Sequence, residues 1–346
     1  MAVFTEVSRE EAAALMAQLN LGTLTALRGI KGGIENTNYF ATTEQGDYVL
    51  TLFERLNAEQ LPFYLELMKH LAQHGIPVPN PTANPNPKAK AQNACHLLHT
   101  VAGKPAAVVN KLAGHSQLSP QPVHCAAVGD MLARMHQAGR DFALNQPNLR
   151  GLPWWNDTAP VVLPHLTPTQ AALLTAELAY QNHVAASAPY QALRRGPVHA
   201  DLFRDNVMFE GDCLSGFFDF YFAGTDAWVF DLAVCLNDWC VDLDSGVMDT
   251  ERLRSFVAAY QEVCPLNAAE RQLLPAMARA AALRFWVSRM WDFQLPRDAA
   301  LLTPHDPGHF ERVLRSRVQT PVTVTWIEGG SARSAEATEI ATELSA

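Results

Sequence analysis

Basic residues and paired cysteines are both scarce in this chain. Its 26 Lys and Arg are outnumbered by 35 Asp and Glu, which gives a formal net charge of -9 at pH 7. A negative chain is not drawn to polyanions, so we expect neither nucleic acid nor a membrane surface as a partner. The 6 cysteines form no CxxC pair and no zinc-type spacing, and most lie in apolar runs. They are therefore expected to stay reduced, as in a cytoplasmic protein.

Long apolar runs and a secretion signal are absent as well. No apolar stretch approaches the ~20 residues that a membrane span needs. The first residues, MAVFTEVSREEAAALM, are acidic where a signal peptide is basic and then apolar. Both observations again favour a cytoplasmic protein. The 346 residues are 48% hydrophobic, which allows a sizeable core, and their length suggests two lobes. The sequence leaves the oligomeric state open.

The pattern of residues 1–103 predicts a small lobe built on an antiparallel sheet. Short β-like runs are separated by Gly-Gly and Gly-Asp pairs, which are strong turn signals. Ser8 and Glu11 form a capping box ahead of a short first helix. A later run has apolar residues at helical spacing and ends at a glycine followed by a proline. The expected strands are 23–31, 35–43, 47–55 and 94–103, and the packed helix is 59–74.

From residue 104 onward the pattern changes to helices. We assign residues 104–326 to a larger lobe that carries the catalytic and substrate groups, and the small, polar residues 327–346 to a flexible tail. The expected fold class is therefore α+β, with a small antiparallel β-sheet lobe and a larger, mainly helical lobe. Helical spacing places the main helices at 123–138, 168–185, 250–262 and 267–293.

One stretch interrupts these helices with an unusual set of polar residues. Residues 197–220, PVHADLFRDNVMFEGDCLSGFFDF, hold one His, four Asp and one Asn around a strand–turn–strand pattern. A hairpin brings its two outer ends side by side, so Asn206 at the start of the first arm and Asp219 at the end of the second converge on one point. Asp201 lies on the loop that leads in. Amide and carboxylate oxygens are suitable ligands for Mg²⁺ that also contacts phosphate oxygens.

The charge around this stretch is strongly one-sided. Between Asp201 and Glu251 there are twelve Asp and Glu but one basic residue, Arg204. Such a surface repels anions unless divalent cations are bound, and it attracts a substrate that carries an ammonium group. Both consequences favour a site for a metal-bound phosphate beside an amine.

The spacing of the polar residues is that of a kinase catalytic loop. His199 and Asp201 are followed five residues later by Asn206 and thirteen residues after that by Asp219. In that arrangement Asp201 accepts the proton of the substrate hydroxyl, and Asn206 and Asp219 hold the metal. His199 is expected to pack and hydrogen-bond the turn. The alternative is an acidic, solvated hairpin without catalytic function.

These residues resemble the aminoglycoside phosphotransferase-like kinases, which share the protein-kinase architecture. The resemblance covers most of the chain and includes GIKGGIENTNYFATT, VGDMLARMHQ and DAWVFDLAVCLNDWC in addition to the stretch above. Within the family, YVLTLFER, DLFRDNVMF, DFYFAGTD and LNDWC are most similar to the homoserine kinases built on this scaffold. The resemblance implies ATP and Mg²⁺ as cofactors. It also implies transfer of the γ-phosphate to the hydroxyl of L-homoserine, a small-molecule substrate on the route to threonine.

The resemblance also implies residues for the nucleotide, with one departure from the family. Thr51 stands where the family pattern has a Lys that contacts the α- and β-phosphates, and Glu66 is the helix residue expected to pair with it. The missing cation is replaced either by Arg55 or by Lys31, and Lys31, Gly32 and Gly33 can also bring backbone N–H groups to the phosphates.

For the acceptor, the chain offers residues in two later segments. Asp238 and Trp239 in LNDWC are candidates for the substrate site, with Asp238 suited to an ammonium group. Arg284 and Arg289 lie on a helix that is otherwise aromatic and apolar, where an arginine needs an anionic partner. That partner is either the carboxylate of the substrate or one of the twelve acids.

Three other functions remain open at this point. Choline, ethanolamine or an aminoglycoside would suit the acidic lobe as well as homoserine does. A nucleotide-binding pseudokinase is favoured by Thr51 in place of the Lys, although intact Asp201, Asn206 and Asp219 argue against it. A protein kinase is the weakest candidate, because no Ala-Pro-Glu pattern follows Asp219.

Overall fold

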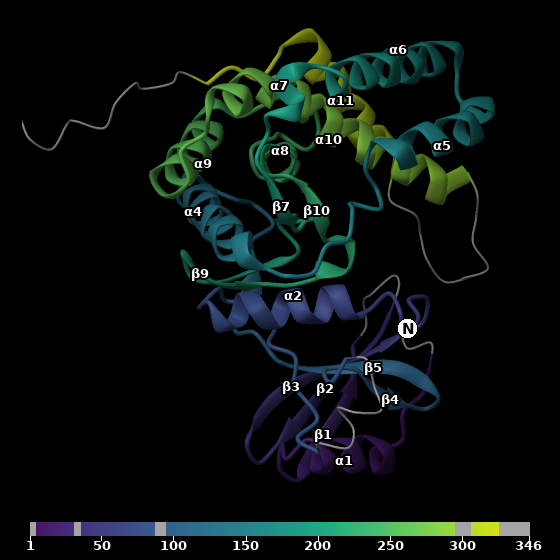
Figure 1. Cartoon of the computed structure of the whole chain (residues 1–346), viewed down its shortest axis with the longest axis vertical. Coiled ribbons are helices and arrows are strands. Elements are labelled where there is room, and N and C mark those ends of the chain that lie inside the picture. Colours follow the sequence, from purple (N-terminus) through teal and green to yellow (C-terminus); the bar gives the residue numbers. More distant parts are fainter. Residues whose placement is uncertain (1–4, 31–35, 87–94, 295–305, 325–346) are drawn as a thin grey trace, which may run out of the picture.

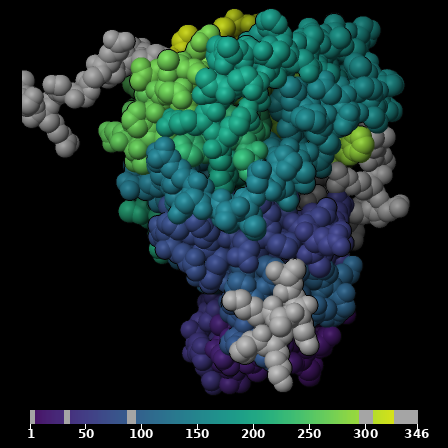
Figure 2. All heavy atoms as spheres, viewed as in Figure 1, coloured from purple at the N-terminus to yellow at the C-terminus, as the bar shows by residue number. Residues whose placement is uncertain are grey.

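The protein has two lobes that differ in their secondary structure (Figure 1). The computed structural model describes residues 5–30, 36–86, 95–294 and 306–324. Within these ranges the small lobe holds a five-stranded sheet with two helices, and the large lobe is mainly helical with two short sheets. In the view of Figure 2 the small lobe is the narrower end of the molecule. The predicted α+β architecture is confirmed.

The small lobe begins with a capped helix and an antiparallel meander. The Ser8 side chain accepts a hydrogen bond from the backbone of Glu11, and the Glu11 side chain accepts one from the backbone of Ser8, so the predicted capping box is present. The three predicted strands of the meander are present within the described residues, as is the packed helix. The elements are α1 (Arg9–Gln18), β1 (Leu24–Gly29), β2 (Asn36–Thr43), β3 (Gly46–Phe53), α2 (Pro62–Gln73), β4 (His99–Val101) and β5 (Lys104–Asn110).

The strand expected at 94–103 is present but shorter, whereas the expected change to helices at residue 104 was wrong. Strand β4 covers only His99–Val101, and the chain then turns through Ala102 and Gly103, which both have positive φ angles. It returns as β5, which pairs with both β4 and β3, so the sheet order is β1-β2-β3-β5-β4. The expected boundary at 103/104 thus falls inside a hairpin of the small sheet. Strand β5 was not predicted because its sequence, KPAAVVN, lacks the polar–apolar alternation of a half-buried strand.

Two hydrophobic clusters organise the molecule. The smaller one joins α1 to the sheet through residues such as Leu15, Met16 and Leu50. The larger one runs from Phe53 and the apolar face of α2 into the core of the large lobe. Helix α2 therefore packs at the junction of the lobes, as Figure 1 shows.

The large lobe surrounds one fully buried helix, α8 (Trp228–Trp239). The predicted helices of this lobe are confirmed, the one at 168–185 to the residue. None of the helices in the described ranges is long and apolar enough to cross a membrane. The other elements are β6 (His115–Ser116), α4 (Pro122–Ala138), η1 (Gly139–Asp141), α5 (Leu152–Val162), η2 (Leu163–His165), α6 (Pro168–Ala185), α7 (Ala188–Gln191), β7 (Arg195–Val198), β8 (Val207–Glu210), β9 (Cys213–Phe217), η3 (Phe220–Phe222), β10 (Gly224–Ala227), α9 (Thr250–Val263), α10 (Ala268–Gln294) and α11 (Gly308–Gln319).

Candidate active site

The hairpin β8–β9 brings together the residues that the sequence singles out. Val207 pairs with Phe217 at the open end of the hairpin. The backbone N–H of Phe218 donates to the carbonyl of Asn206 at 3.0 Å, which places Asp219 one residue from this contact. The Asn206 side-chain amide donates to the Asp201 carbonyl at 2.9 Å. Asp201, Asn206 and Asp219 thus meet at one end of the hairpin.

Two non-glycine residues at this end have left-handed backbone conformations. Ala200 has a φ of 62° and Asp219 a φ of 69°. Such conformations cost on the order of 1 kcal/mol or more each and persist where the surroundings fix them. Here His199 Nε2 lies 2.9 Å from the Phe218 carbonyl and ties the loop before Asp201 to the residue before Asp219. His199 is fully buried, which fits the structural role expected of it.

Asp231, near the start of α8, fixes the backbone of the loop that precedes Asp201. Its two carboxylate oxygens accept hydrogen bonds from the backbone N–H groups of His199 and Ala200, both at 2.8 Å. His136 on α4 lies 3.1 Å from one of these oxygens. Burial alone would raise the pKa of Asp231, but the hydrogen bond and charge of His136 hold the pKa below its ordinary value. Asp231 is therefore an ionised, buried anchor of the catalytic loop.

The Asp201 carboxyl lies among charges of both signs. Burial raises its pKa well above the ordinary value, and the nearby carboxylates of Asp219 and Asp205 raise it further. Arg284 and Arg289 oppose this effect. Carboxylates that destabilise one another's charge in this way are stabilised by a cation placed between them.

The donor set at this point suits a divalent metal ion. Among the described residues none donates a hydrogen bond to the Asn206 amide oxygen, whereas its amide nitrogen is held by the Asp201 carbonyl. That oxygen and the Asp219 carboxylate are hard ligands, as Mg²⁺ and Ca²⁺ prefer. The residues present therefore fit a metal ion that also binds phosphate oxygens.

The side chain of Arg284 on α10 lies next to the carboxylate of Asp201. Its Nη1 lies 4.0 Å from a carboxylate oxygen of Asp201, and only 3% of its surface is exposed. Its Nε and Nη2 have no hydrogen-bond partner among the described residues. The guanidinium stacks on the ring of Phe285, with 3.7 Å to the centroid. Burial lowers its pKa to about 10, partly offset by Asp201, so the side chain stays charged at neutral pH.

Arg289 lies close to the same carboxylates but is turned toward α11. Its Nη1 is 3.4 Å from the Asp306 carbonyl, and its guanidinium lies 4.5 Å from the ring centroid of Phe310. Burial lowers its pKa, and the charges of Asp238 and Asp201 partly offset the effect. The positive charge of Arg289 still acts on the Asp201 carboxyl, whose pKa it lowers.

Asp238 and Trp239 are buried and contact the loop that precedes Asn206. Asp238 is nearly buried and accepts hydrogen bonds from both the backbone and the guanidinium of Arg204. Trp239 has no exposed surface, and its indole N–H donates to the Leu202 carbonyl at 2.9 Å. Both hold the loop between Asp201 and Asn206 in this structure, and their expected contact with the substrate stays a prediction.

The predicted nucleotide residues are not brought together by the described contacts. Thr51 donates a hydrogen bond to the Asn38 side chain at 2.7 Å and is also linked to Tyr221. Glu66 on α2 lies 3.8 Å from a ring nitrogen of His96. Lys31, Gly32 and Gly33 lie outside the described residues.

Sequence reasoning missed one cation of the site, Arg150. Its guanidinium lies 4.3 Å from the ring centroid of Trp154, and its charge is close enough to Arg284 to lower the pKa of that residue. It stands 51 positions before Asp201 in a loop that carries no catalytic motif. The adjacent pair Trp154 and Trp155, which favours cation–π contacts with an arginine, was the available signal.

Comparison with known proteins assigns the chain to a class of enzymes. The Phosphotransferase enzyme family matches residues 26–291, and the chain belongs to that family. The chain is 65% identical over 321 residues to the homoserine kinase of Polaromonas naphthalenivorans, covering 93% of this chain and 99% of that one. It is 56% identical over 319 residues to the homoserine kinase of a Janthinobacterium species, covering 92% and 97%.

Solved structures support the fold. An amicoumacin kinase in complex with AMP-PNP, Ca²⁺ and Ami is similar with a TM-score of 0.62 at 18% identity, over 91% of this chain and 95% of that one. A choline/ethanolamine kinase family protein from Mesorhizobium loti has a TM-score of 0.61 at 17% identity, over 89% and 93%. The chain is thus an ATP-dependent phosphotransferase that uses a divalent metal and a small-molecule alcohol acceptor.

Proposed function

We propose that this protein transfers the γ-phosphate of Mg²⁺-bound ATP to the side-chain hydroxyl of L-homoserine. The observation that carries the proposal is Arg284, a buried arginine with two unpartnered nitrogens beside Asp201. Homoserine carries a carboxylate, and a guanidinium binds a carboxylate through two parallel hydrogen bonds. The relatives at 65% and 56% identity, both homoserine kinases, support the same substrate.

Asn206 and Asp219 would hold the metal ion. When bound, Mg²⁺ neutralises the charge that the triphosphate brings to an acidic surface and orients the transferred group. Burial, and after it the nearby carboxylates of Asp219 and Asp205, raise the pKa of Asp201, and a cation held by Asn206 and Asp219 would offset the repulsion between these carboxylates. The metal ion would supply the positive charge that the acidic hairpin needs, and the nucleotide would supply further oxygen ligands to the ion.

Asp201 would receive the acceptor hydroxyl. A loose transition state needs little proton abstraction, so the main contribution of Asp201 is to orient the hydroxyl and then to take up its proton. The backbone bonds from His199 and Ala200 to Asp231 fix the loop that precedes it. The arrangement holds one carboxylate in place before substrate arrives.

The charges around Asp201 match the two ends of the acceptor. Arg284, with Arg150 and Arg289 close to it, favours the carboxylate of the substrate. Asp201, Asp205 and Asp219 favour its ammonium group, by charge alone. An acceptor without a carboxylate, such as choline or an aminoglycoside, would leave Arg284 buried and without an anion.

An assay of ADP release with a panel of acceptors tests this function. L-homoserine, choline, L-threonine and kanamycin are compared at equal concentration with ATP and Mg²⁺. The expected result is rapid turnover with homoserine alone. Turnover of choline or kanamycin in preference to homoserine contradicts the substrate proposal, and ATP binding without turnover of any acceptor indicates a pseudokinase.

A further inference from the structure

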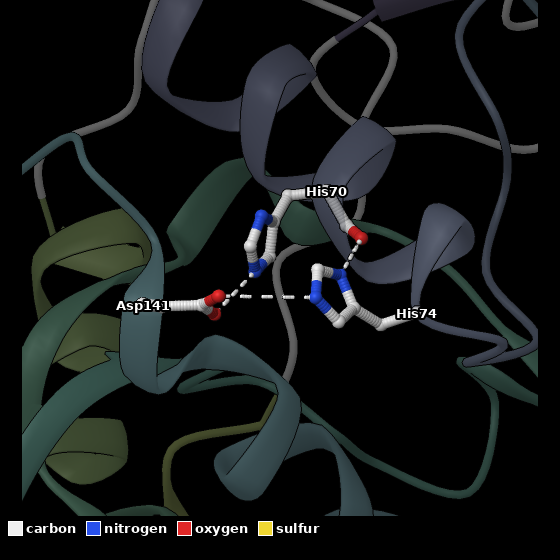
Figure 3. A group of neighbouring side chains, drawn as sticks. All are labelled: His70, His74 and Asp141. Carbon is white, nitrogen blue, oxygen red and sulfur yellow. Dashed lines mark hydrogen bonds and ion pairs between the residues drawn. The ribbon is translucent and has the colours of Figure 1, made fainter.

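A cluster of three side chains lies at the junction of the lobes, outside the candidate active site. His70 lies in the last turn of α2, His74 caps the C-terminal end of this helix, and Asp141 belongs to η1 in the large lobe (Figure 3). His70 Nε2 is 3.3 Å from one carboxylate oxygen of Asp141, and His74 Nε2 is 4.0 Å from the other. The three ligand atoms lie within 4.8 Å of one another.

The hydrogen bond of His74 fixes the tautomer of its ring. Nδ1 lies 2.8 Å from the carbonyl oxygen of His70, and because a carbonyl can only accept, Nδ1 carries the proton. In the neutral ring Nε2 then presents a lone pair to the Asp141 carboxylate. Two acceptors that face each other repel unless a cation lies between them.

The surroundings of His70 add further acceptors. Its Nε2 lies 2.8 Å from the Ala138 carbonyl and 3.3 Å from Asp141. The carbonyl can only accept, so Nε2 of His70 carries the proton in the metal-free protein. A metal ion bound at Nε2 would replace the bond to Ala138, and the ring proton would move to Nδ1. The cluster as a whole is rich in lone pairs and short of positive charge.

We propose that this cluster is a binding site for a divalent transition-metal ion of the Zn²⁺ class. His70 and His74 would bind through Nε2 and Asp141 through its carboxylate, the ligand types that zinc takes. Bonds of ~2 Å to a tetrahedral ion place ligand atoms about 3.3 Å apart, close to the 3.3 Å between His70 and Asp141. Closing the 4.0 Å gap to His74 requires a small movement of two exposed side chains.

Two further features fit a metal site. A metal-bound histidine commonly donates its other ring N–H to a backbone carbonyl, and the bond from His74 to His70 is of that kind. The rings of His70 and Phe142 are 5.3 Å apart, so an apolar wall covers one side of the cluster. The side chains of His74 and Asp141 are 41% and 74% exposed, which leaves the site open to ions from solvent.

An ion in this site would link the small lobe to the large lobe. Its histidine ligands come from the C-terminal end of α2, which packs at the lobe junction, and its carboxylate comes from η1, directly after α4. Because the site needs both lobes in their folded arrangement, the ion binds the folded chain in preference to the unfolded one. Zinc would therefore raise the midpoint of thermal unfolding.

Titration of the purified full chain with ZnCl₂ against a chelating dye, in millimolar Mg²⁺, tests the site. Excess Mg²⁺ competes for the acidic hairpin but not for imidazole ligands. The wild-type chain is expected to bind one Zn²⁺ tightly. His74→Gln and Asp141→Asn should each weaken that binding by about tenfold or more. His183→Gln, which removes an exposed histidine on α6, is the matched control and should bind like the wild type.

Thermal unfolding with and without Zn²⁺ supplies the second readout. The wild type and His183→Gln should gain stability with zinc, and His74→Gln and Asp141→Asn should not. Their phosphotransfer activity in Mg²⁺ without zinc should equal that of the wild type, because neither residue belongs to the candidate active site. Absence of tight binding in the wild type, or equal binding in all four proteins, overturns the proposal and leaves a cluster that binds protons only.

Discussion

The guanidinium of Arg284 lies 4.0 Å from the carboxylate of Asp201, and two of its nitrogens bond to no described residue. A buried cation of this kind is stable only with an anion nearby. Asp201 supplies part of that compensation, at a distance longer than a hydrogen bond. An anionic group of a bound substrate would complete it, next to the carboxylate that receives the hydroxyl.

Replacement of Arg284 should therefore separate substrates by their carboxylate. In Arg284→Gln we expect kcat/KM for L-homoserine to fall by roughly 10- to 100-fold, since a hydrogen bond to a charged group contributes about 1.5–3 kcal/mol. For 3-aminopropan-1-ol, which is homoserine without its carboxylate, kcat/KM should change little. The measurement is steady-state kinetics with both acceptors.

Arg134→Gln is the control for this experiment, because Arg134 forms an exposed pair with Asp130 on α4, away from the site. It should leave both acceptors unaffected. An equal loss for the two acceptors in Arg284→Gln would mean that Arg284 acts on Asp201 or the nucleotide and not on the substrate carboxylate.

The metal requirement should depend on Asp219 and not on carboxylates elsewhere in the hairpin. In Asp219→Asn we expect the Mg²⁺ concentration for half-maximal activity to rise at least about tenfold and kcat to fall, because a neutral amide binds the ion less strongly. Glu210→Gln changes an exposed residue at the turn of the same hairpin and should match the wild type. The test is a Mg²⁺ titration of activity at saturating ATP. Equal Mg²⁺ dependence in both variants would remove Asp219 from the metal site.

The anchor of the catalytic loop should make stability depend on pH. Asp231→Asn removes a buried carboxylate that accepts hydrogen bonds from His199, Ala200 and His136, and it should destabilise the fold by about 3 kcal/mol at pH 7. The folded-state pKa of Asp231 lies below its ordinary value, so its contribution is complete above about pH 4. It is lost as the pH falls through the folded-state pKa.

Urea unfolding of the wild type and of Asp231→Asn between pH 7 and pH 3 measures this effect. The difference in unfolding free energy should be largest near neutral pH and shrink in acid. Asp130→Asn removes an exposed ion pair on α4 and should cost at most about 1 kcal/mol. A pH-independent difference for Asp231→Asn would mean that its carboxylate is already protonated in the folded protein.

Local patterns in the sequence were sufficient for the fold class and for the hairpin. Asp201, Asn206 and Asp219 lie within nineteen positions, and turn chemistry alone brings the ends of β8 and β9 together. The capping box of Ser8 and the helix at 168–185 are equally local. Strand β5 was missed because its pairing with β3 is long-range and its own residues show no alternation.

Roles that depend on burial were not accessible in the same way. Sequence alone does not tell that Trp239 faces Leu202 in the core or that Asp238 pairs with Arg204. Nor does it bring Arg150 to Arg284, since the two are 134 positions apart. Such contacts are set by the packing of α5, α8 and α10, which no short motif encodes.

The most direct test of the account is the turnover number of Asp201→Asn with L-homoserine, ATP and Mg²⁺. Asp157→Asn, an exposed change on α5, is measured beside it. We predict a fall in kcat of about 10²- to 10⁴-fold for Asp201→Asn with little change in the KM for ATP, and wild-type values for Asp157→Asn. Wild-type turnover in Asp201→Asn would contradict the assignment of this carboxylate, and of the hairpin around it, as the catalytic centre.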